Sequence, residues 1–419
     1  MADSRWDVAL TGIGLVTPLG LDSSESVSKA LRGESAAALL PESEGGIAAA
    51  MVPPFDLTPH LRTPKNLKLI GHSVRLAVLA MREAVAQSGF GGGFNESERV
   101  GVYVGSGQTG LEYDEFFKAL AVAWENGKEQ DFKYLGGMPA RLLDRYFSLR
   151  TLANAGIAVI STEFGARGPS NNFVQGEIAL ALALQSACYD LMEGRADAVL
   201  VAAYDALVFP SQFMAFRTMG LLSGDGRGVA YRPFDRDREG IVLGEGAACF
   251  VLERGADAKA RKAAILAKIH GIGLTSQTSD ESSLGAGVEE ISRAAGEAAP
   301  DARVDFVFAR GFGTQHEDAL EASALDRFVP AGAYVSAVKG QTGYLGAAGA
   351  GVELGLGLLS ARMGYVPPVG GLVQPDAGVT LPFVRSNAAE IERPNPHGLF
   401  LACSFGGQVA AIAAQAIRN

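Results

Sequence analysis

A carboxylate stands where the chain would be expected to expose a nucleophile. Residues 168–194 read GPSNNFVQGEIALALALQSACYDLMEG, in which a Gly-Pro turn and a short strand lead to an Ala/Leu-rich helix beginning at Glu177. The first turn of a helix offers unpaired N–H groups and the positive end of the helix dipole. A strand-turn-helix elbow of this kind commonly presents a Ser or a Cys. The Glu at this position therefore needs an explanation.

Other polar residues do not form a recognisable metal or disulfide site. The segment RPFDRDREGIVLGEG contains Asp235, Asp237, Arg238 and Glu245, which could pass for a carboxylate site; the family resemblance described below implies instead that they are structural turn and hairpin residues. The cysteines are Cys188, Cys249 and Cys403, and the histidines are His60, His72, His270, His316 and His397. Their scatter and the lack of CxxC spacing argue against zinc and disulfides. We expect no metal, no cofactor and a reducing, cytoplasmic location.

Composition limits the classes of partner. The chain has 419 residues and a formal net charge of −10, so general nucleic-acid binding, which needs clustered Lys and Arg, is not expected. The N-terminal MADSRWDVALTGIG has no apolar core typical of a secretory signal. The most apolar helix, 178–192, is interrupted by polar residues and shorter than a membrane span, so we interpret it as a buried core helix.

The elements that must position the elbow alternate along the chain. Apolar runs predict strands at 7–10, 100–104, 198–203, 248–253, 304–309 and 398–402, and periodic segments predict helices at 69–88, 110–126, 177–193, 288–298, 317–328 and 346–363. This alternation predicts an α/β protein with largely covered sheets. Residues 41–66 and 274–287 are expected to be irregular excursions, and no short-period repeat is evident. A composition shift near residue 255 predicts halves at 1–255 and 256–419.

Several motifs in a fixed order resemble one family. They are LTGIGLVTPLG (10–20), GVYVGSG (101–107), RPFDRDREGIVLGEGAACFVLE (232–253), KGQTGYLGAAGAGVE (339–353) and SFGG (404–407). Each is weak alone, but together they span the chain and closely resemble the β-ketoacyl-acyl-carrier-protein synthases, the condensing enzymes of fatty-acid and polyketide assembly. The resemblance implies a thiolase-like fold: a five-layer α/β/α/β/α sandwich of two duplicated halves, with a dimer across the central strands.

The resemblance also implies a Cys-His-His site, and this chain departs from it at all three positions. Glu177 stands at the position of the nucleophilic Cys, Arg310 at that of the first His and Tyr344 at that of the second. Cys188 and His316 lie too far along the chain to replace them. A Glu would form an unstable mixed anhydride and would repel an approaching malonyl carboxylate. Condensation by this chain alone is not expected.

The three replaced residues are predicted to contact one another. In the family the elbow residue faces the first His, so we expect Glu177 and Arg310 to form an ion pair that fills the former site, with the Tyr344 hydroxyl hydrogen-bonded to one of them. Lys339 and Glu321 match buried supporting groups of the family. Phe405 matches a loop that gates the acyl pocket, although a role as a core aromatic is an equally good interpretation. The carboxylate is thus interpreted as a structural plug.

Inactive members of this family are typically chain-length factors, which bind an active ketosynthase and shape its acyl tunnel. The resemblance implies that role here, in a type II polyketide or aryl polyene system, with an acyl carrier protein contacted through the partner. The retained motifs favour a polyene product. The residues that could set the tunnel length are Tyr113, Phe116, Phe117 and Leu120, although their helical spacing is also typical of core packing.

Two other functions remain open from the sequence. The chain could be an enzyme with altered chemistry on acyl thioesters, such as a decarboxylase, hydrolase or acyltransferase that uses Glu177 as a general base. Arg310 argues against this, because a nearby cation lowers the pKa of a carboxyl group. The chain could also be a homodimeric protein that holds an acyl chain or a carrier without chemistry. An open, apolar pocket at the elbow would favour these alternatives, whereas a closed one would favour the inactive subunit.

Overall fold

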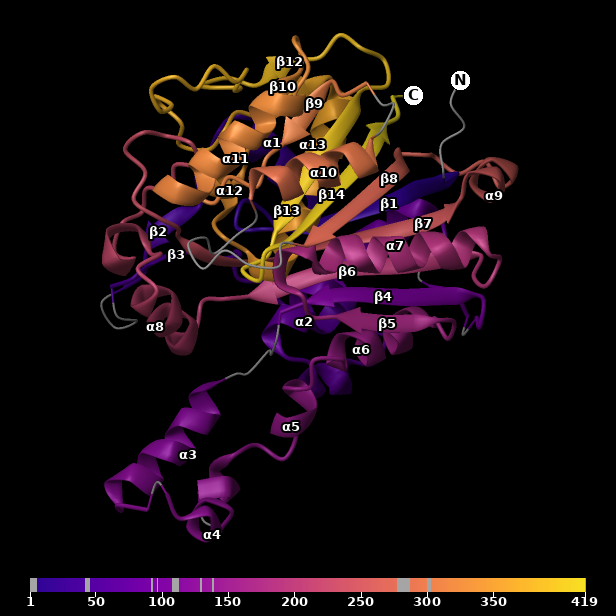
Figure 1. The fold of residues 1–419 in the computed structure, drawn as a ribbon. Coiled ribbons are helices and arrows are strands. Elements are labelled where there is room, and N and C mark those ends of the chain that lie inside the picture. Colours follow the sequence, from indigo (N-terminus) through magenta and orange to yellow (C-terminus); the bar gives the residue numbers. More distant parts are fainter. Residues whose placement is uncertain are drawn as a thin grey trace.

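The computed structural model describes residues 6–41, 46–91, 93–95, 97–107, 113–128, 130–137, 139–276, 287–299 and 303–418. Within them, strands from the two halves of the chain meet at the centre, and helices cover the sheet faces (Figure 1). The predicted fold class, a thiolase-like α/β sandwich, is confirmed.

The first sheet is built from the N-terminal part of the chain. Its strands lie in the order β1 (Val8–Val16), β7 (Leu243–Arg254), β6 (Ala198–Ala206), β4 (Val100–Ser106) and β5 (Ser170–Phe173). The β1–β7 and β7–β6 pairs are antiparallel, whereas the β6–β4 and β4–β5 pairs are parallel. The short strand β5 therefore forms the outer edge of this sheet and leads directly into the elbow.

The second sheet repeats this arrangement. Its strands lie in the order β8 (Ala267–Ser276), β14 (Gln408–Ala416), β13 (His397–Cys403), β9 (Phe306–Phe308) and β10 (Tyr334–Ser336). The first two pairings are again antiparallel and the last two parallel. Strand β1 pairs with β8 over a short stretch, from Val8 opposite Ile269 to Leu10 opposite Ala267, so the two sheets join at their first strands. The halves are duplicated, while the boundary after residue 255 stays a prediction.

Matching glycines reveal the same duplication in the sequence. A Cβ atom on Gly12 or Gly14 of β1 would lie 2.0 or 1.9 Å from a backbone carbonyl oxygen of α2 (His72–Ser88). A Cβ atom on Gly271 or Gly273 of β8 would lie 2.2 or 2.0 Å from one of α10 (Val288–Ala298). The helices can approach the strands this closely only where no side chain intervenes. The segments TGIGL (11–15) and HGIGL (270–274) are thus a long-range repeat, in addition to the absence of a short-period repeat noted in the sequence.

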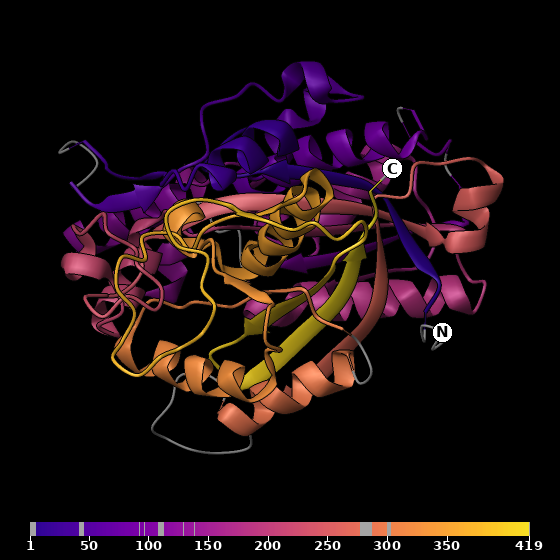
Figure 2. The ribbon, with the colours of Figure 1, turned by 90° about the horizontal axis from the view of Figure 1, so that it is seen from above.

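Helices form layers on both outer faces of the sheets and between them (Figures 1 and 2). Helices α2 and α6 (Ala155–Phe164) pack on the outer face of the first sheet, and α10 and α11 (Gln315–Phe328) cover the second. Between the sheets lie α7 (Ala179–Met192) and α13 (Gly349–Met363), whose Ala- and Leu-rich surfaces contribute to the largest apolar cluster. The interpretation of 178–192 as a buried core helix is confirmed.

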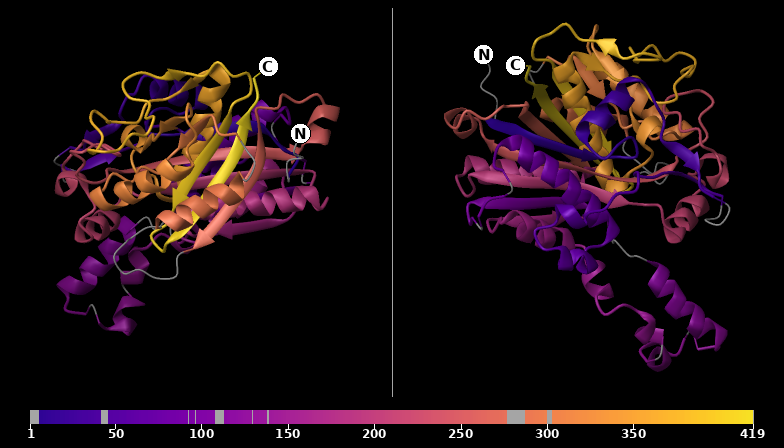
Figure 3. Two further views of the ribbon diagram at one scale, coloured as in Figure 1. Left: turned by 45° about the horizontal axis from the view of Figure 1, so that its top comes forward. Right: turned by 180° about the vertical axis from the view of Figure 1, so that it is seen from behind.

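One group of helices projects away from the body. Helices α3 (Tyr113–Glu125), α4 (Phe132–Leu135) and α5 (Phe147–Arg150) extend beyond α6, on the side of the molecule where β5 lies (Figures 1 and 3). We call residues 113–152 the arm. Several of its large apolar side chains are exposed, with exposed fractions of 73% for Trp124, 50% for Leu149 and 53% for Leu152.

The remaining elements are short. They are α1 (Ser23–Leu31), β2 (Ala37–Leu39), β3 (Ala48–Ala50), α8 (Pro210–Thr218), α9 (Gly255–Ala260), α12 (Lys339–Thr342), β11 (Tyr365–Val366), β12 (Ala389–Glu390) and the 3₁₀ turns Thr58–His60, Pro64–Leu69, Pro139–Leu142, Gly176–Ile178, Ser223–Gly226 and Gly346–Ala348. The predicted excursion at 274–287 is wrong at its start, because residues 274–276 complete β8; residues 277–286 lie outside the described residues. Residues 41–66 were also expected to be irregular, but Ala48–Ala50 within them form strand β3, which pairs with β7.

Candidate functional site

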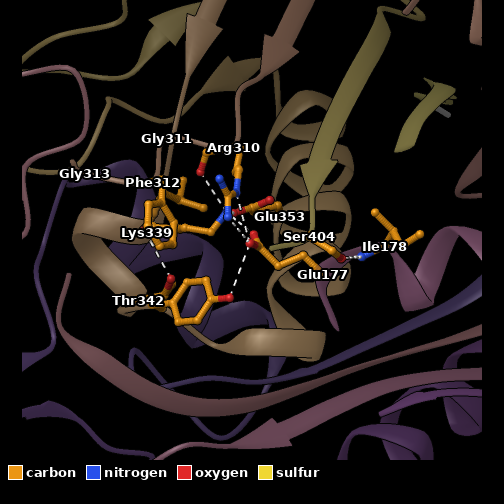
Figure 4. Close-up of polar contacts among 12 residues, drawn as sticks. Glu177, Ile178, Arg310, Gly311, Phe312, Gly313, Lys339, Thr342, Glu353 and Ser404 are labelled. Carbon is orange, nitrogen blue, oxygen red and sulfur yellow. Dashed lines mark hydrogen bonds and ion pairs between the residues drawn. The ribbon is translucent and has the colours of Figure 1, made fainter. Parts of the chain in front are cut away.

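The elbow turns sharply and buries its carboxylate. Only Val174, Gln175 and Gly176 separate β5 from Glu177, which lies in the turn Gly176–Ile178 just before α7. Gly176 has a φ of +60°, a left-handed backbone that L side chains rarely adopt. Glu177 has an exposed fraction of 1% although Gln175 and Gly176 are exposed. The side chain therefore points inward, and Figure 4 shows it among residues that come from the second half of the chain.

The expected contact between Glu177 and Arg310 is present. The Nε and Nη2 atoms of Arg310 donate hydrogen bonds of 3.0 and 2.8 Å to Oε1 of Glu177. The Tyr344 hydroxyl lies 3.4 Å from the same oxygen and donates a longer hydrogen bond to it. Exposed fractions of 3% for Arg310 and 4% for Tyr344 show that both partners are buried. Arg310 and Tyr344 thus meet at one oxygen of Glu177, as the motif positions of these three residues predicted.

Lys339 supplies a second positive charge. Its Nζ atom lies 3.3 Å from Oε2 of Glu177 and 2.5 Å from Oε1 of Glu353, and it donates a 2.7 Å hydrogen bond to the carbonyl of Arg310. Within the described part of the chain, Oε2 of Glu177 accepts no hydrogen bond. The 3.3 Å contact therefore acts mainly as a charge interaction. Glu177 is held between two cations, one on each of its oxygens.

Further carboxylates surround these cations. Glu321 accepts the backbone N–H groups of Arg310 and Gly311 at 2.7 and 2.9 Å, which fixes the backbone that carries Arg310. Oε2 of Glu317 lies 3.6 Å from Nη1 of Arg310. The sequence predicted a supporting position for Glu321 but not for Glu317 or Glu353. Glu353 is the charged residue within the apolar run GAGVELGLGLL, and that isolation is the signal that could have identified it.

Burial and charge shift the pKa values of the site in identifiable directions. Burial acts to lower the pKa of Arg310, but the interactions with Glu177, Cys403 and Tyr344 together raise this pKa well above its ordinary value. Lys339 behaves in the same way, with Glu353 and Glu177 raising its pKa against the effect of burial. Burial, reinforced by Glu177, raises the pKa of Tyr344. Both cations therefore stay charged, and Tyr344 remains a neutral donor.

Two supporting carboxyl groups titrate near neutrality. Burial raises the pKa of Glu321 to about 7, against the hydrogen bond from the Gly311 N–H group. Burial also raises the pKa of Glu353 to about 7, although Lys339 opposes the shift. Each of these two carboxyl groups is therefore partly protonated around neutral pH. Partial protonation limits the excess of negative charge around Arg310 and Lys339.

Aromatic rings close the space around Arg310. Its guanidinium lies over the ring of Phe312, with 4.1 Å between Cζ and the ring centroid, and 5.9 Å from that of Phe405. The Phe405 ring also contacts Phe312 edge-on, with 5.5 Å between centroids, and lies near the rings of Phe216 and Tyr344. Phe405, at the position of the family's gating loop, thus packs in an aromatic cluster around the ion pair.

Ser404 ties this loop to the elbow. Its hydroxyl donates a 2.5 Å hydrogen bond to the carbonyl of Gln175. It also accepts one of 3.3 Å from the N–H of Ile178 (Figure 4). The N–H group of Ile178, which the start of α7 would otherwise offer to a ligand, is therefore already hydrogen-bonded to Ser404. The sequence predicted no role for Ser404, because its contacts depend on how close the segment 404–407 lies to the elbow.

A cavity of about 420 Å³ lies outside the ion pair. Gln175, Tyr344, Ser404 and Phe405 contribute to its wall, together with Asp205, but Glu177 does not. The carboxylate thus lies behind the residues that face the cavity. The elbow thus keeps a cavity from which Glu177 itself is shielded, whereas a closed pocket was the arrangement expected for an inactive subunit.

The predicted tunnel residues lie elsewhere, on α3 of the arm. Phe117 has an exposed fraction of 42% and Leu120 is partly buried, whereas the side chains of Tyr113 and Phe116 lie outside the described residues. The role of these residues in tunnel length stays a prediction. His316 is exposed at the start of α11, and Cys188 is buried inside α7, so neither joins the site.

The described residues contain no group of three or more His, Cys, Asp or Glu side chains arranged to hold a metal ion. Asp235 instead accepts backbone N–H groups from Val373, Gln374 and Asp237, and Arg238 donates to the carbonyl of Thr314. These are structural turn contacts. No helix in the described part of the chain is long and apolar enough to cross a membrane.

Comparisons with known proteins agree with the motifs. The family model described as "Beta-ketoacyl synthase, N-terminal domain" matches residues 6–258, and "Beta-ketoacyl synthase, C-terminal domain" matches 266–372. A putative polyketide β-ketoacyl synthase 1 of Streptomyces cyaneus is 33% identical over 97% of each chain. A 3-oxoacyl-[acyl-carrier-protein] synthase 2 of Coxiella burnetii is 30% identical over 92% of this chain and 93% of its own.

Solved structures show the same fold over the whole chain. The structure described as "The ishigamide ketosynthase/chain length factor" has a TM-score of 0.83 and 25% identity, and covers 99% of this chain and 100% of its own. A β-ketoacyl synthase from Burkholderia phymatum has a TM-score of 0.84 and 24% identity, with 99% and 100% covered. With two family models spanning most of its length and relatives of at least 30% identity, the chain belongs to the β-ketoacyl synthase family.

Proposed function

We propose that this chain is a non-catalytic ketosynthase-like subunit, a chain-length factor, that forms a heterodimer with an active ketosynthase. The observation that carries the proposal is the ion pair between Glu177 and Arg310. A carboxylate bound by Arg310, Lys339 and Tyr344 stands at the position that the sequence motifs predict for the family's nucleophile, and it lies behind the cavity wall. The chain then contributes to polyketide or aryl polyene elongation through its partner, which contacts the malonyl-loaded acyl carrier protein.

The shape of the molecule supports a partner. The outer edge of β5 is exposed, and no other strand of the described residues pairs with that edge. The arm extends on the same side and exposes Trp124, Leu149 and Leu152. Exposed strand edges and clustered apolar side chains are unfavourable in an isolated protein and are often covered by a partner. The similarity to a protein described as a ketosynthase/chain length factor favours a ketosynthase as that partner.

The alternative, an enzyme that uses Glu177 as a base, fits the geometry less well. A general base needs access to its substrate and a carboxylate that is not already neutralised. Both oxygens of Glu177 lie within 3.3 Å of a cationic nitrogen, and the side chain has an exposed fraction of 1%. Such a base would have to break a buried ion pair before each turnover.

The proposal is tested by producing the chain with an active ketosynthase from the same gene cluster. Native mass spectrometry should detect a 1:1 complex, and that complex should extend an acyl chain from malonyl-carrier protein. This chain alone should extend and decarboxylate nothing, since its nucleophile position is closed. A chain that stays separate from the ketosynthase, or that turns over malonyl-carrier protein by itself, would contradict the proposal.

A further inference from the structure

A second cavity lies away from the elbow, beside the helices α2 and α6 that pack on the outer face of the first sheet. Its volume is about 630 Å³, which is within the range of small-molecule sites in proteins. The segment 59–62, α2, the residues that follow α2 and the C-terminal end of α6 border it. None of the described residues that line this cavity also lines the cavity at the elbow.

Two walls of this cavity are tied to the end of α6. The backbone N–H of Arg62 donates a 2.6 Å hydrogen bond to Oε2 of Glu163, and that of Phe94 donates one of 2.8 Å to the carbonyl of Phe164. Gly93 has a φ of +149°, and a Cβ atom there would lie 2.7 Å from the same carbonyl oxygen. The chain thus needs a glycine to bring Phe94 so close to α6. Walls that are fixed before a ligand arrives reduce the ordering cost of binding.

Basic side chains predominate in the polar part of the wall. His60, Arg62 and Arg82 line the cavity together with one carboxylate, Glu163. Glu163 has an exposed fraction of 3% and already accepts from the Arg62 N–H and, at 3.2 Å, from Nη2 of Arg82. Among the described residues the wall therefore carries two guanidinium groups and one buried carboxylate. This balance favours an anion over a cation.

Arg82 has a donor that the described fold does not use. Its guanidinium lies over the ring of Phe164, with 4.9 Å between Cζ and the ring centroid. Its Nε atom is buried and has no hydrogen-bond acceptor within the described part of the chain. A buried donor without an acceptor is unfavourable, and native structures usually satisfy such a group with protein, water or a ligand. An oxygen bound beside Arg82 would supply the missing acceptor.

Aromatic rings form the apolar part of the wall. Phe90 and Phe94 are half-buried, and their ring centroids lie 4.6 Å apart. The guanidinium of Arg261 lies 4.1 Å from the centroid of Phe90 and helps to fix this pair of rings. An inorganic anion would leave the rings and most of the volume unused. The wall therefore fits a ligand that joins a negative group to an apolar body.

We propose that this cavity binds a small aromatic carboxylate, whose carboxylate contacts Arg62 and Arg82 and whose ring packs against Phe90 and Phe94. A carboxylate matches the planar fork of a guanidinium group. Aromatic rings pair favourably when their centroids are roughly 4.5–7 Å apart, so the two phenylalanines can receive a third ring. The proposal does not depend on the chain-length-factor role, because the cavity shares none of its described residues with the replaced catalytic positions.

The test measures binding of benzoate to the full-length chain by ligand-observed NMR, with acetate and inorganic phosphate as comparison probes. If the chain is obtained only with the ketosynthase, the complex is used. Arg82→Gln removes the central donor, and Phe94→Ala removes one ring. Arg62→Gln removes a charge but keeps the backbone N–H that holds Glu163. The control is Arg217→Gln on the surface, where the side chain has an exposed fraction of 63%. The melting midpoint of each variant is measured without ligand.

We expect saturable benzoate binding with a dissociation constant of about 1 mM or lower, and weaker binding of acetate and phosphate. Arg82→Gln should raise the benzoate dissociation constant about tenfold or more, because a charge-assisted hydrogen bond is lost. Arg62→Gln and Phe94→Ala should raise it by smaller factors, and Arg217→Gln should leave it unchanged. If Arg82→Gln does not fold, the other two variants decide the outcome.

Three results would overturn the inference. The first is the absence of saturable benzoate binding up to about 10 mM. The second is benzoate binding that is unchanged in the folded variants of Arg62, Arg82 and Phe94, which would place the benzoate elsewhere. The third is acetate or phosphate binding as tight as that of benzoate, which would show that the rings contribute nothing.

Discussion

At the scale of single residues, Glu177 is stable in the interior because its charge is compensated on both sides. Burying an unpaired carboxylate is costly, whereas a paired and hydrogen-bonded one can be close to neutral in free energy. Arg310 donates to one oxygen through two nitrogens, and Lys339 faces the other. Removing one partner should therefore cost more than the pair contributes as a whole.

A double-mutant cycle on Glu177 and Arg310 tests this coupling. Glu177→Ala and Arg310→Ala should each lower the free energy of unfolding by about 3–5 kcal/mol, because each leaves a buried charge with too few partners. The double variant should lose clearly less than the sum of the two. Chemical denaturation of all four proteins measures the coupling, and strictly additive losses would show that the pair does not act as a unit.

Arg217 and Asp225 provide a matched control. They form a 2.6 Å ion pair on the surface, where their side chains have exposed fractions of 63% and 68%. Solvent screens such a pair, so the same cycle on these two residues should give a coupling energy near zero.

The sequence could predict Glu177, Arg310 and Tyr344 as neighbours because each occupies a fixed position in a motif. It could not predict Glu317, and it passed over Glu353, because both lie on helices whose inward-facing side is set by packing. Ser404 was missed for a similar reason: its partners are Gln175 and Ile178, which are distant in the sequence and are brought close only by the fold.

At the scale of elements, the arm is the part of the molecule that stands apart from the shared sandwich. α3 projects from the body and exposes large apolar side chains, which is consistent with a helix that packs against another chain (Figure 3). It lies on the same side of the molecule as the exposed edge of β5 (Figure 1), so one partner can contact both surfaces. The residues proposed to set product length lie on this helix.

Phe117→Ala tests the tunnel-length role of α3. In the complex with the active ketosynthase, removal of this bulky ring should lengthen the product if Phe117 forms part of the tunnel floor. Mass spectrometry of the carrier-bound products measures chain length. Trp124→Ala, farther along the same helix, is the control for a general effect on the arm; unchanged lengths for Phe117→Ala and Phe116→Ala would remove α3 from the tunnel.

The sequence predicted long apolar strands and helices better than strands of small residues. β6 and β7 are rich in Val, Leu and Ala and were found, whereas β8 (AKIHGIGLTS) and β14 (QVAAIAAQA) were not. The glycines that make β8 look like a loop are required by the close approach of α10. Only packing between elements reveals that requirement, so single-residue propensity favours the wrong structure here.

At the scale of the whole molecule, two duplicated halves meet at one site. The elbow belongs to the first half, and Arg310, Lys339 and Ser404 belong to the second, so the site around Glu177 is a junction between the halves. The family fold could be predicted from the order of the motifs. The contact of Glu177 with Arg310 and Tyr344 could be predicted from their motif positions, whereas the contacts of Lys339, Glu353 and Ser404 required the structure.

The most direct test of a structural rather than chemical role for Glu177 is an acyl-extension assay on the complex with the active ketosynthase. Two complexes are compared with the unaltered one: one carries Glu177→Gln in this chain, and the other carries Cys→Ala at the nucleophile of the partner. We predict that the Glu177→Gln complex still extends the acyl chain and that the Cys→Ala complex does not. Extension that survives loss of the partner's Cys but disappears with Glu177→Gln would show that Glu177 is a reagent and would contradict this account.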